Sequence, residues 1–72
     1  MWELNYKYAD IKKKLIKLWF VLKRQAKWSH EIWLKDETIV VLPNHGNKTI
    51  SKWVVKSIIK KLWLTYEEFR KL

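Results

Sequence analysis

The sequence contains no cysteine, and this absence excludes two common ways of stabilising a small protein. No disulfide can form, and no zinc site with thiolate ligands can be built. The two histidines are too few for a structural zinc, which usually takes four ligands. A chain of 72 residues is one domain at most and buries only about 60% of its unfolded surface. We therefore expect one domain with one apolar core, no metal and no small-molecule cofactor.

Long apolar runs and acidic residues are also scarce. Uninterrupted apolar stretches such as Ile39 to Leu42 are far shorter than a bilayer span, and the N-terminus lacks the apolar run of a signal peptide. We therefore expect a cytoplasmic protein with no membrane partner. Sixteen Lys and Arg residues against seven Asp and Glu give a net charge of +9, which attracts polyanions. Nucleic acid is the expected partner, although lysine-rich faces also serve solubility in small helical proteins.

Two segments have the apolar periodicity of amphipathic helices. The first spans residues 8–18, with Asp10 in its first turn and a polar face that comprises Lys12, Lys13, Lys14 and Lys17. The second follows Thr49 or Ser51, either of which suits an N-cap. Its predicted core positions are Val55, Ile58, Ile59 and Leu62, and its basic stripe is Lys52, Lys56 and Lys60. Thr65 and Glu68 form a capping box that opens a short last helix over 66–71.

Between the two helices the pattern changes to that of strands. The predicted strands cover 20–24, 29–34 and 38–42, and the last has the continuous β-branched run of a central strand. In the second, His30 and Trp33 lie on opposite faces; Trp33 is expected to pack on the sheet or contact a partner. Pro43 ends the third strand and opens a loop. The predicted fold class is α+β: α-β-β-β-α plus a short C-terminal helix. Two helices cover one face of a three-stranded antiparallel sheet, and the other face is free.

Five short motifs occur in this order, and together they resemble the HicA toxins. They are Asp10 to Phe20, Ser29-His30, Val41 to Asn47, Ser57 to Lys60, and Thr65 to Phe69. The resemblance implies one HicA-like domain over 1–72, in which 1–7 form an N-terminal extension, and a fold like that of double-stranded-RNA-binding domains. It also implies a toxin of a type II toxin–antitoxin system, an endoribonuclease that cleaves mRNA and is neutralised by a HicB-like antitoxin.

The sequence departs from the family pattern where the family has glycine, at Trp19, Trp28, Trp53 and Trp63. One glycine is present, whereas the average usage of about 7% predicts about five. Trp19 and Trp63 follow predicted helix ends, where a positive φ favours glycine. We interpret the four tryptophans as UGA codons that mean glycine in the source lineage. Deliberate engineering and a genuine tryptophan-rich sequence are the alternatives.

Ser29-His30 resembles the core of the family's Gly-Ser-His motif, which makes His30 the expected catalytic residue. Imidazole can take the proton of a ribose 2′-hydroxyl or protonate the leaving 5′-oxygen, and neither step needs a metal. Lys23, Arg24 and Lys27 could stabilise the charged transition state, and Ser29 could position a phosphate oxygen. The alternative is that His30 is an ordinary strand residue.

Other predicted RNA contacts lie outside this motif. His45, beside the only glycine, is expected to contact RNA or support the site, or else to cap a neighbouring backbone group. Lys52 and Lys56 are expected to contact phosphates, or else to form a solvated helix face. Two other functions stay open: a non-catalytic RNA-binding module of the same fold, favoured if Trp28 blocks the motif, and a structural or membrane-surface protein.

Overall fold

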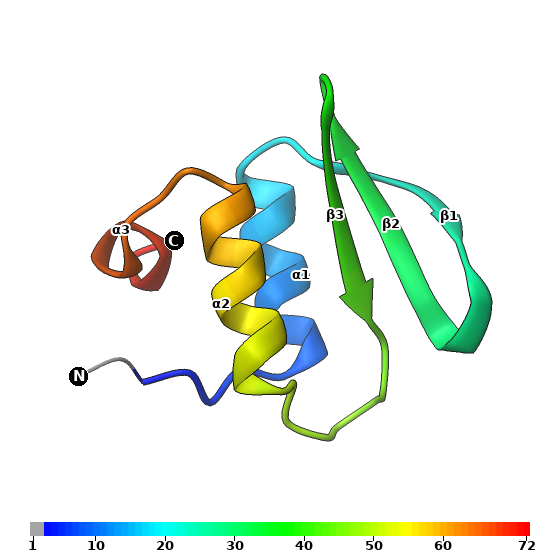
Figure 1. The fold of residues 1–72 in the computed structure, drawn as a ribbon, viewed down its shortest axis with the longest axis horizontal. Helices are drawn as coiled ribbons and strands as arrows, with labels where there is room; N and C mark the ends of the chain where they lie inside the picture. Colours follow the sequence, from blue (N-terminus) through cyan, green and yellow to red (C-terminus); the bar gives the residue numbers. More distant parts are fainter. Residues whose placement is uncertain (1–2) are drawn as a thin grey trace.

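A computed structural model describes residues 3–72 (Figure 1). Its elements are α1 (Tyr8–Lys17), β1 (Val21–Gln25), the 3₁₀ turn η1 (Lys27–Ser29), β2 (His30–Lys35), β3 (Thr38–Pro43), α2 (Lys52–Lys61) and α3 (Tyr66–Arg70). β1 pairs with β2 and β2 with β3, both antiparallel. The predicted α+β class, the order of elements and the antiparallel sheet are confirmed, as is the arrangement of a double-stranded-RNA-binding-like fold.

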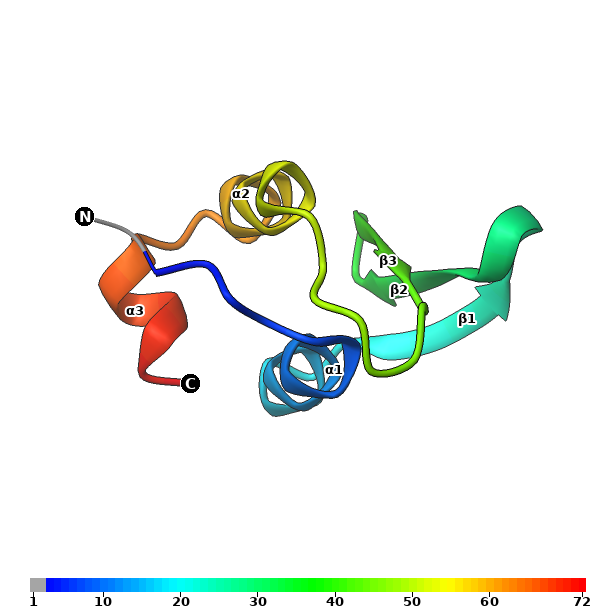
Figure 2. The same ribbon diagram turned by 90° about the horizontal axis from the view of Figure 1, so that it is seen from below.

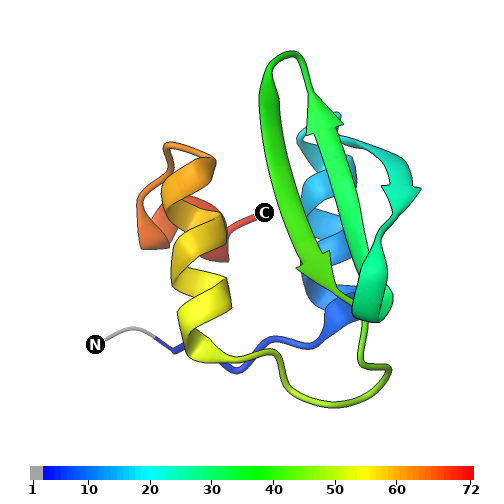
Figure 3. The same cartoon turned by 45° about the vertical axis from the view of Figure 1, so that its right-hand side comes forward.

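Helices α1 and α2 lie on the same side of the sheet, and its other face is open (Figures 1 and 2). In Figure 3, α1 runs behind the sheet while α2 runs beside β3. The prediction that 38–42 form the central strand is wrong, because β2 lies between β1 and β3. The run in β3 is apolar throughout for another reason: Val40 and Leu42 enter the core, whereas Ile39 and Val41 line a groove beside α2.

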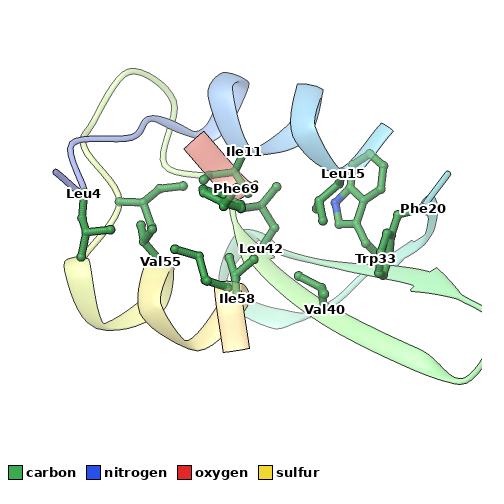
Figure 4. Close-up of a cluster of buried hydrophobic side chains, with 12 residues drawn as sticks. Leu4, Ile11, Leu15, Phe20, Trp33, Val40, Leu42, Val55, Ile58 and Phe69 are labelled. Carbon is green, nitrogen blue, oxygen red and sulfur yellow. The ribbon is translucent and has the colours of Figure 1, made fainter. Parts of the chain in front are cut away.

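The core fills the space between the sheet and the helices (Figure 4). Phe20, Leu15 and Trp33 gather at one end, and Leu4 and Val55 lie at the other (Figure 4). Trp33 is only 3% exposed, so it packs on the sheet. Burying such aromatic and branched side chains contributes roughly 1.5–3 kcal/mol each.

Residues that precede α1 also belong to this packing. Leu4 is buried, the backbone N–H of Ile50 donates to the Tyr6 carbonyl at 2.8 Å, and Lys7 forms a β-bridge with Thr49. The ring of Tyr6 meets Phe69 of α3 edge-on, at 5.4 Å between centroids. Segment 3–7 therefore joins α3 to the start of α2.

The helix termini follow the local sequence. Asp10 accepts a hydrogen bond from the Lys7 N–H at 2.9 Å. The predicted capping box is confirmed, since Thr65 N–H donates to Glu68 at 2.8 Å and Glu68 N–H donates to the Thr65 hydroxyl at 3.1 Å. Ser51 is the N-cap of α2, although its side chain makes no capping bond.

Lys14 differs from the prediction that it lies on the exposed face of α1. It is 8% exposed, and its ammonium group donates to the carbonyls of Phe69, Arg70 and Leu72 at 2.9, 3.4 and 3.2 Å. An ammonium group has three donors, so all three are used, at the C-terminal end of a helix where cations are favoured. Lys14 therefore fastens α3 to α1.

We expect Lys14→Met to lower the free energy of unfolding by about 2 kcal/mol, because it leaves carbonyl groups buried without their charged donor. Urea denaturation would measure this change. The matched control is Lys13→Met, which removes the neighbouring exposed lysine and should change stability by less than about 0.5 kcal/mol. Equal effects of the two substitutions would contradict the role assigned to Lys14.

Three of the four tryptophans singled out in the sequence have left-handed backbones. Trp19, Trp28 and Trp63 have φ values of 71°, 62° and 59°. In the two helix ends, Phe20 N–H donates to the Leu15 carbonyl and Leu64 N–H to the Ile59 carbonyl, which is the pattern of a Schellman motif. In that motif the left-handed residue is usually glycine.

Candidate functional site

His30 is the first residue of β2 and directly follows a strained turn. Trp28 and Ser29 are both left-handed, with φ values of 62° and 63°. Ala26 N–H then donates to the His30 carbonyl at 2.6 Å, which closes the turn. A left-handed non-glycine residue costs about 1–3 kcal/mol and is held only by surrounding structure. The backbone before His30 is therefore tightly specified.

The alternation of β2 decides what shares a face with His30. Glu31 and Trp33 point into the core, so His30 and Ile32 point to the open face of the sheet. Arg24 of β1 pairs with Ile32 and therefore lies on this open face, diagonal to His30. The register thus places Arg24 on the same face of the sheet as the imidazole, and Ser29 directly precedes His30 in the chain.

His30 also lines a groove of about 450 Å³ between β3 and α2. Val41 and Pro43 form its β3 side, and Val54, Ser57 and Lys61 of α2 form part of the other. The lining is mainly apolar, with the imidazole and the Lys61 ammonium group among its few polar groups. A concave apolar surface with a few convergent polar groups is the usual form of a ligand site.

On the core-facing side of the sheet, a buried carboxylate fixes the loop that follows β3. Glu31 accepts hydrogen bonds from the Tyr8 hydroxyl at 2.8 and 2.9 Å, from the Trp33 indole at 3.1 Å and from the Asn44 side chain at 3.4 Å. Asn44 N–H donates to the Ser29 carbonyl at 3.0 Å. The loop is thereby tied to the residue that precedes the imidazole. We did not predict roles for Glu31 and Asn44; the only signal was a carboxylate on the core-facing side of β2.

The ionisation of the Tyr8 hydroxyl shows whether the hydrogen-bond network around Glu31 is intact. Burial, together with the hydrogen bond to Glu31 and its charge, raises the pKa of Tyr8 to about 12. The folded state keeps this proton between pH 10, where an unfolded tyrosine loses it, and pH 12. The stabilisation is therefore present below pH 10 and is lost as the pH rises through 12.

We expect the difference in 295 nm absorbance between the wild type and Tyr8→Phe to titrate with a midpoint near pH 12. Urea denaturation between pH 9 and 12 should show a steeper loss of stability for the wild type than for Tyr8→Phe. A difference titration centred near pH 10 would show that the hydroxyl is not held by Glu31.

The other residues that were predicted to contact RNA are spread over the surface. Lys56 lines a second groove of about 660 Å³. This groove adjoins the first at four shared residues, Ile39, Trp53, Ser57 and Lys61. Four others are exposed and line neither groove: Lys23, Lys27, His45 and Lys52. The sequence analysis gave no site role to Ser57 and Lys61, which lie at i and i+4 on the face of α2 toward β3.

Among residues 3–72, no three His, Asp or Glu side chains are grouped so that they could hold a metal ion. No helix in this part of the chain has the length and apolar character needed to cross a membrane. The model of a protein family described as "HicA toxin of bacterial toxin-antitoxin" matches residues 8–64, a span that contains every predicted site residue. A search of curated proteins found no match.

Proposed function

The chain belongs to the HicA toxin family of bacterial toxin–antitoxin systems, and from this membership we propose that it is an endoribonuclease. Its substrate is mRNA, its catalytic residue is His30, and a HicB-like antitoxin neutralises it. The observation that carries the proposal is the position of His30. It follows a strained turn, shares the open face of the sheet with Arg24, and also lines the groove between β3 and α2. We place this activity in the cytoplasm, where mRNA is found.

The reaction is an attack of a ribose 2′-oxygen on the adjacent phosphorus. The new P–O2′ bond forms as the P–O5′ bond breaks, which gives a 2′,3′-cyclic phosphate and a 5′-hydroxyl. The imidazole of His30 takes the 2′-hydroxyl proton or donates one to the departing 5′-oxygen. Arg24, with Lys23 and Lys27 from the same edge, offsets the negative charge that develops on the phosphate. Ser29 donates a hydrogen bond to a phosphate oxygen.

Contacts outside the reacting phosphate hold the rest of the strand. Lys52 and Lys56 bind phosphates without reading sequence, and His45 contacts RNA from the loop after β3. Such contacts predict that RNA affinity falls steeply with salt concentration.

The proposal is tested with the purified protein, a fluorescent single-stranded RNA and EDTA. We expect cleavage that continues in EDTA and stops when an equimolar amount of the HicB-like antitoxin is added. Intact RNA after prolonged incubation with protein shown to be folded by circular dichroism would contradict the endonuclease activity.

One observation favours the second candidate, an RNA-binding module without cleavage. Trp28 is 82% exposed and stands two residues before His30, where the family resemblance predicts glycine. A bulky indole at this point can displace the scissile phosphate, and a misplacement of about 1 Å can cost 100-fold in rate. Under this candidate, the wild type binds RNA but leaves it intact.

We expect Trp28→Gly to raise the cleavage rate about tenfold or more, because it removes the indole and relaxes the turn before His30. Single-turnover cleavage would measure the change. The control is Trp19→Gly, which relieves the same kind of backbone strain at the end of α1 and lines neither groove. An equal gain from both variants would show that the effect is one of stability and not of access to the imidazole.

A further inference from the structure

β3 is an edge strand, and most of its length, 38–42, carries none of the residues that usually protect such strands. Within residues 3–72 it pairs with β2 on one side and with no strand on the other. Natural edge strands carry charged residues, prolines or bulges, or are covered by a helix or loop, and these features prevent further pairing. In β3 the one proline is the last residue, Pro43, and a groove separates the strand from α2. β3 has no charged residue, and its Ile39 and Val41 side chains are 45% and 46% exposed. Its outer edge is therefore a template for an added strand.

The space beside this edge is a groove and not flat surface. A strand that pairs with β3 would lie about 4.8 Å from it, with alternate side chains toward the open face and toward α2. Ile39 and Val41 line the groove on the β3 side, and α2 contributes Val54 and Ser57. An added strand would thus find apolar contacts along both of its faces.

The positive charge around the groove favours a ligand that carries acidic side chains. Lys61 lines both grooves, and Lys60 and Lys56 line the second, in which Glu37 is the one acidic lining residue. The chain as a whole carries a net charge of +9. An extended segment that alternates apolar and acidic side chains is complementary to this surface in both shape and charge.

We propose that the outer edge of β3 and the facing surface of α2 bind an extended acidic segment of the antitoxin as an additional strand. Its apolar side chains cover Ile39 and Val41, and its carboxylates reach Lys60 and Lys61. Because His30 lines the same groove, a strand seated there covers the imidazole. The inference rests on the proposed function for the identity of the partner, and it adds how that partner masks the site.

The test uses the whole ¹⁵N-labelled protein and, as probe, a blocked ten-residue peptide of alternating valine and glutamate. A peptide of alternating valine and lysine is the matched control. We expect the acidic peptide to slow amide exchange at alternate residues of β3 and to shift resonances on the β3-facing side of α2. The basic peptide should do neither.

Two substitutions and a control locate the binding surface. Ile39→Lys places a charge on the outer edge, and Lys61→Glu reverses the charge of the groove; each should weaken binding of the acidic peptide at least tenfold. Val21→Lys changes a residue that is also β-branched and is 61% exposed, on the opposite edge strand, and it should alter binding less than twofold. Thermal melts check that each variant is folded. If Ile39→Lys does not fold, Lys61→Glu alone tests the binding surface.

Four results would overturn the proposal. Protection could appear on β1 instead of β3, the basic peptide could bind as tightly, single-stranded RNA could protect β3 in place of the acidic peptide, or β3 could pair with a second copy of the chain. None of these readouts depends on cleavage. Loss of the proposed function would appear as intact RNA in the cleavage assay, so the two failures are distinguishable.

Discussion

Replacement of His30 by alanine is expected to lower the rate of RNA cleavage by about 100- to 10,000-fold, the range that general acid–base catalysis supplies. The imidazole is half-buried and lines the groove, so truncation removes the group that moves the proton without opening the core. Single-turnover cleavage in EDTA would measure the loss. RNA binding at low salt should be retained, because phosphate contacts supply most of the affinity.

His45→Ala is the matched control, since it removes the same ring from the exposed loop after β3. We expect it to weaken RNA binding and to leave the rate at saturating protein within about threefold of the wild type. A His30→Ala variant that cleaves at the wild-type rate would remove His30 from the reaction. An equal loss in both variants would mean that neither histidine is the specific proton carrier.

The combined replacement of Trp19, Trp28 and Trp63 by glycine is expected to raise the free energy of unfolding by about 3 kcal/mol. Each tryptophan is left-handed and more than four-fifths exposed, so each contributes backbone strain and little packing. Relief of a left-handed non-glycine conformation is worth about 1–2 kcal/mol, less the extra entropy that glycine gives the unfolded chain. Urea denaturation of the triple variant would measure the gain.

Trp53→Gly provides the matched control for this prediction. Trp53 is 84% exposed, like the other three, but it lies inside α2 with a right-handed backbone. There glycine should destabilise the helix by about 0.5–1 kcal/mol. A gain from Trp53→Gly, or no gain from the triple variant, would contradict the assignment of strain to backbone conformation.

These results would also bear on the origin of the tryptophans. The backbone argument applies at 19, 28 and 63, and it does not apply at 53. We therefore retain the proposal that the source lineage reads these codons as glycine, alongside engineering and a genuine sequence. Peptide mass spectrometry of the natural protein separates them, because glycine at these four positions would establish the first.

Features set by neighbouring residues were predictable from the sequence. The apolar spacing of Val55, Ile58 and Ile59 placed the buried face of α2, and the Thr65–Glu68 capping box placed the start of α3. The tryptophan positions after both helices showed the expected positive φ. Each of these depends on contacts within about five residues, which spacing and residue type encode directly.

Features set by residues distant in the chain were not predictable. The spacing in α1 placed Lys14 on the polar face, but α3, some 55 residues later, supplies the carbonyls that bury it. An apolar run could not distinguish a central strand from an edge strand that borders a groove beside α2. The link from Glu31 to Asn44 likewise depends on the pairing of β2 with β3.

The measurement that tests the central claim most directly is the chemical nature of the RNA ends after cleavage in EDTA. Attack by a neighbouring 2′-oxygen, with His30 moving the proton, predicts 5′-hydroxyl ends and 2′,3′-cyclic phosphates, and no cleavage where that ribose lacks its 2′-hydroxyl. Products with 5′-phosphates, or cleavage that persists at a 2′-deoxy position, would contradict it.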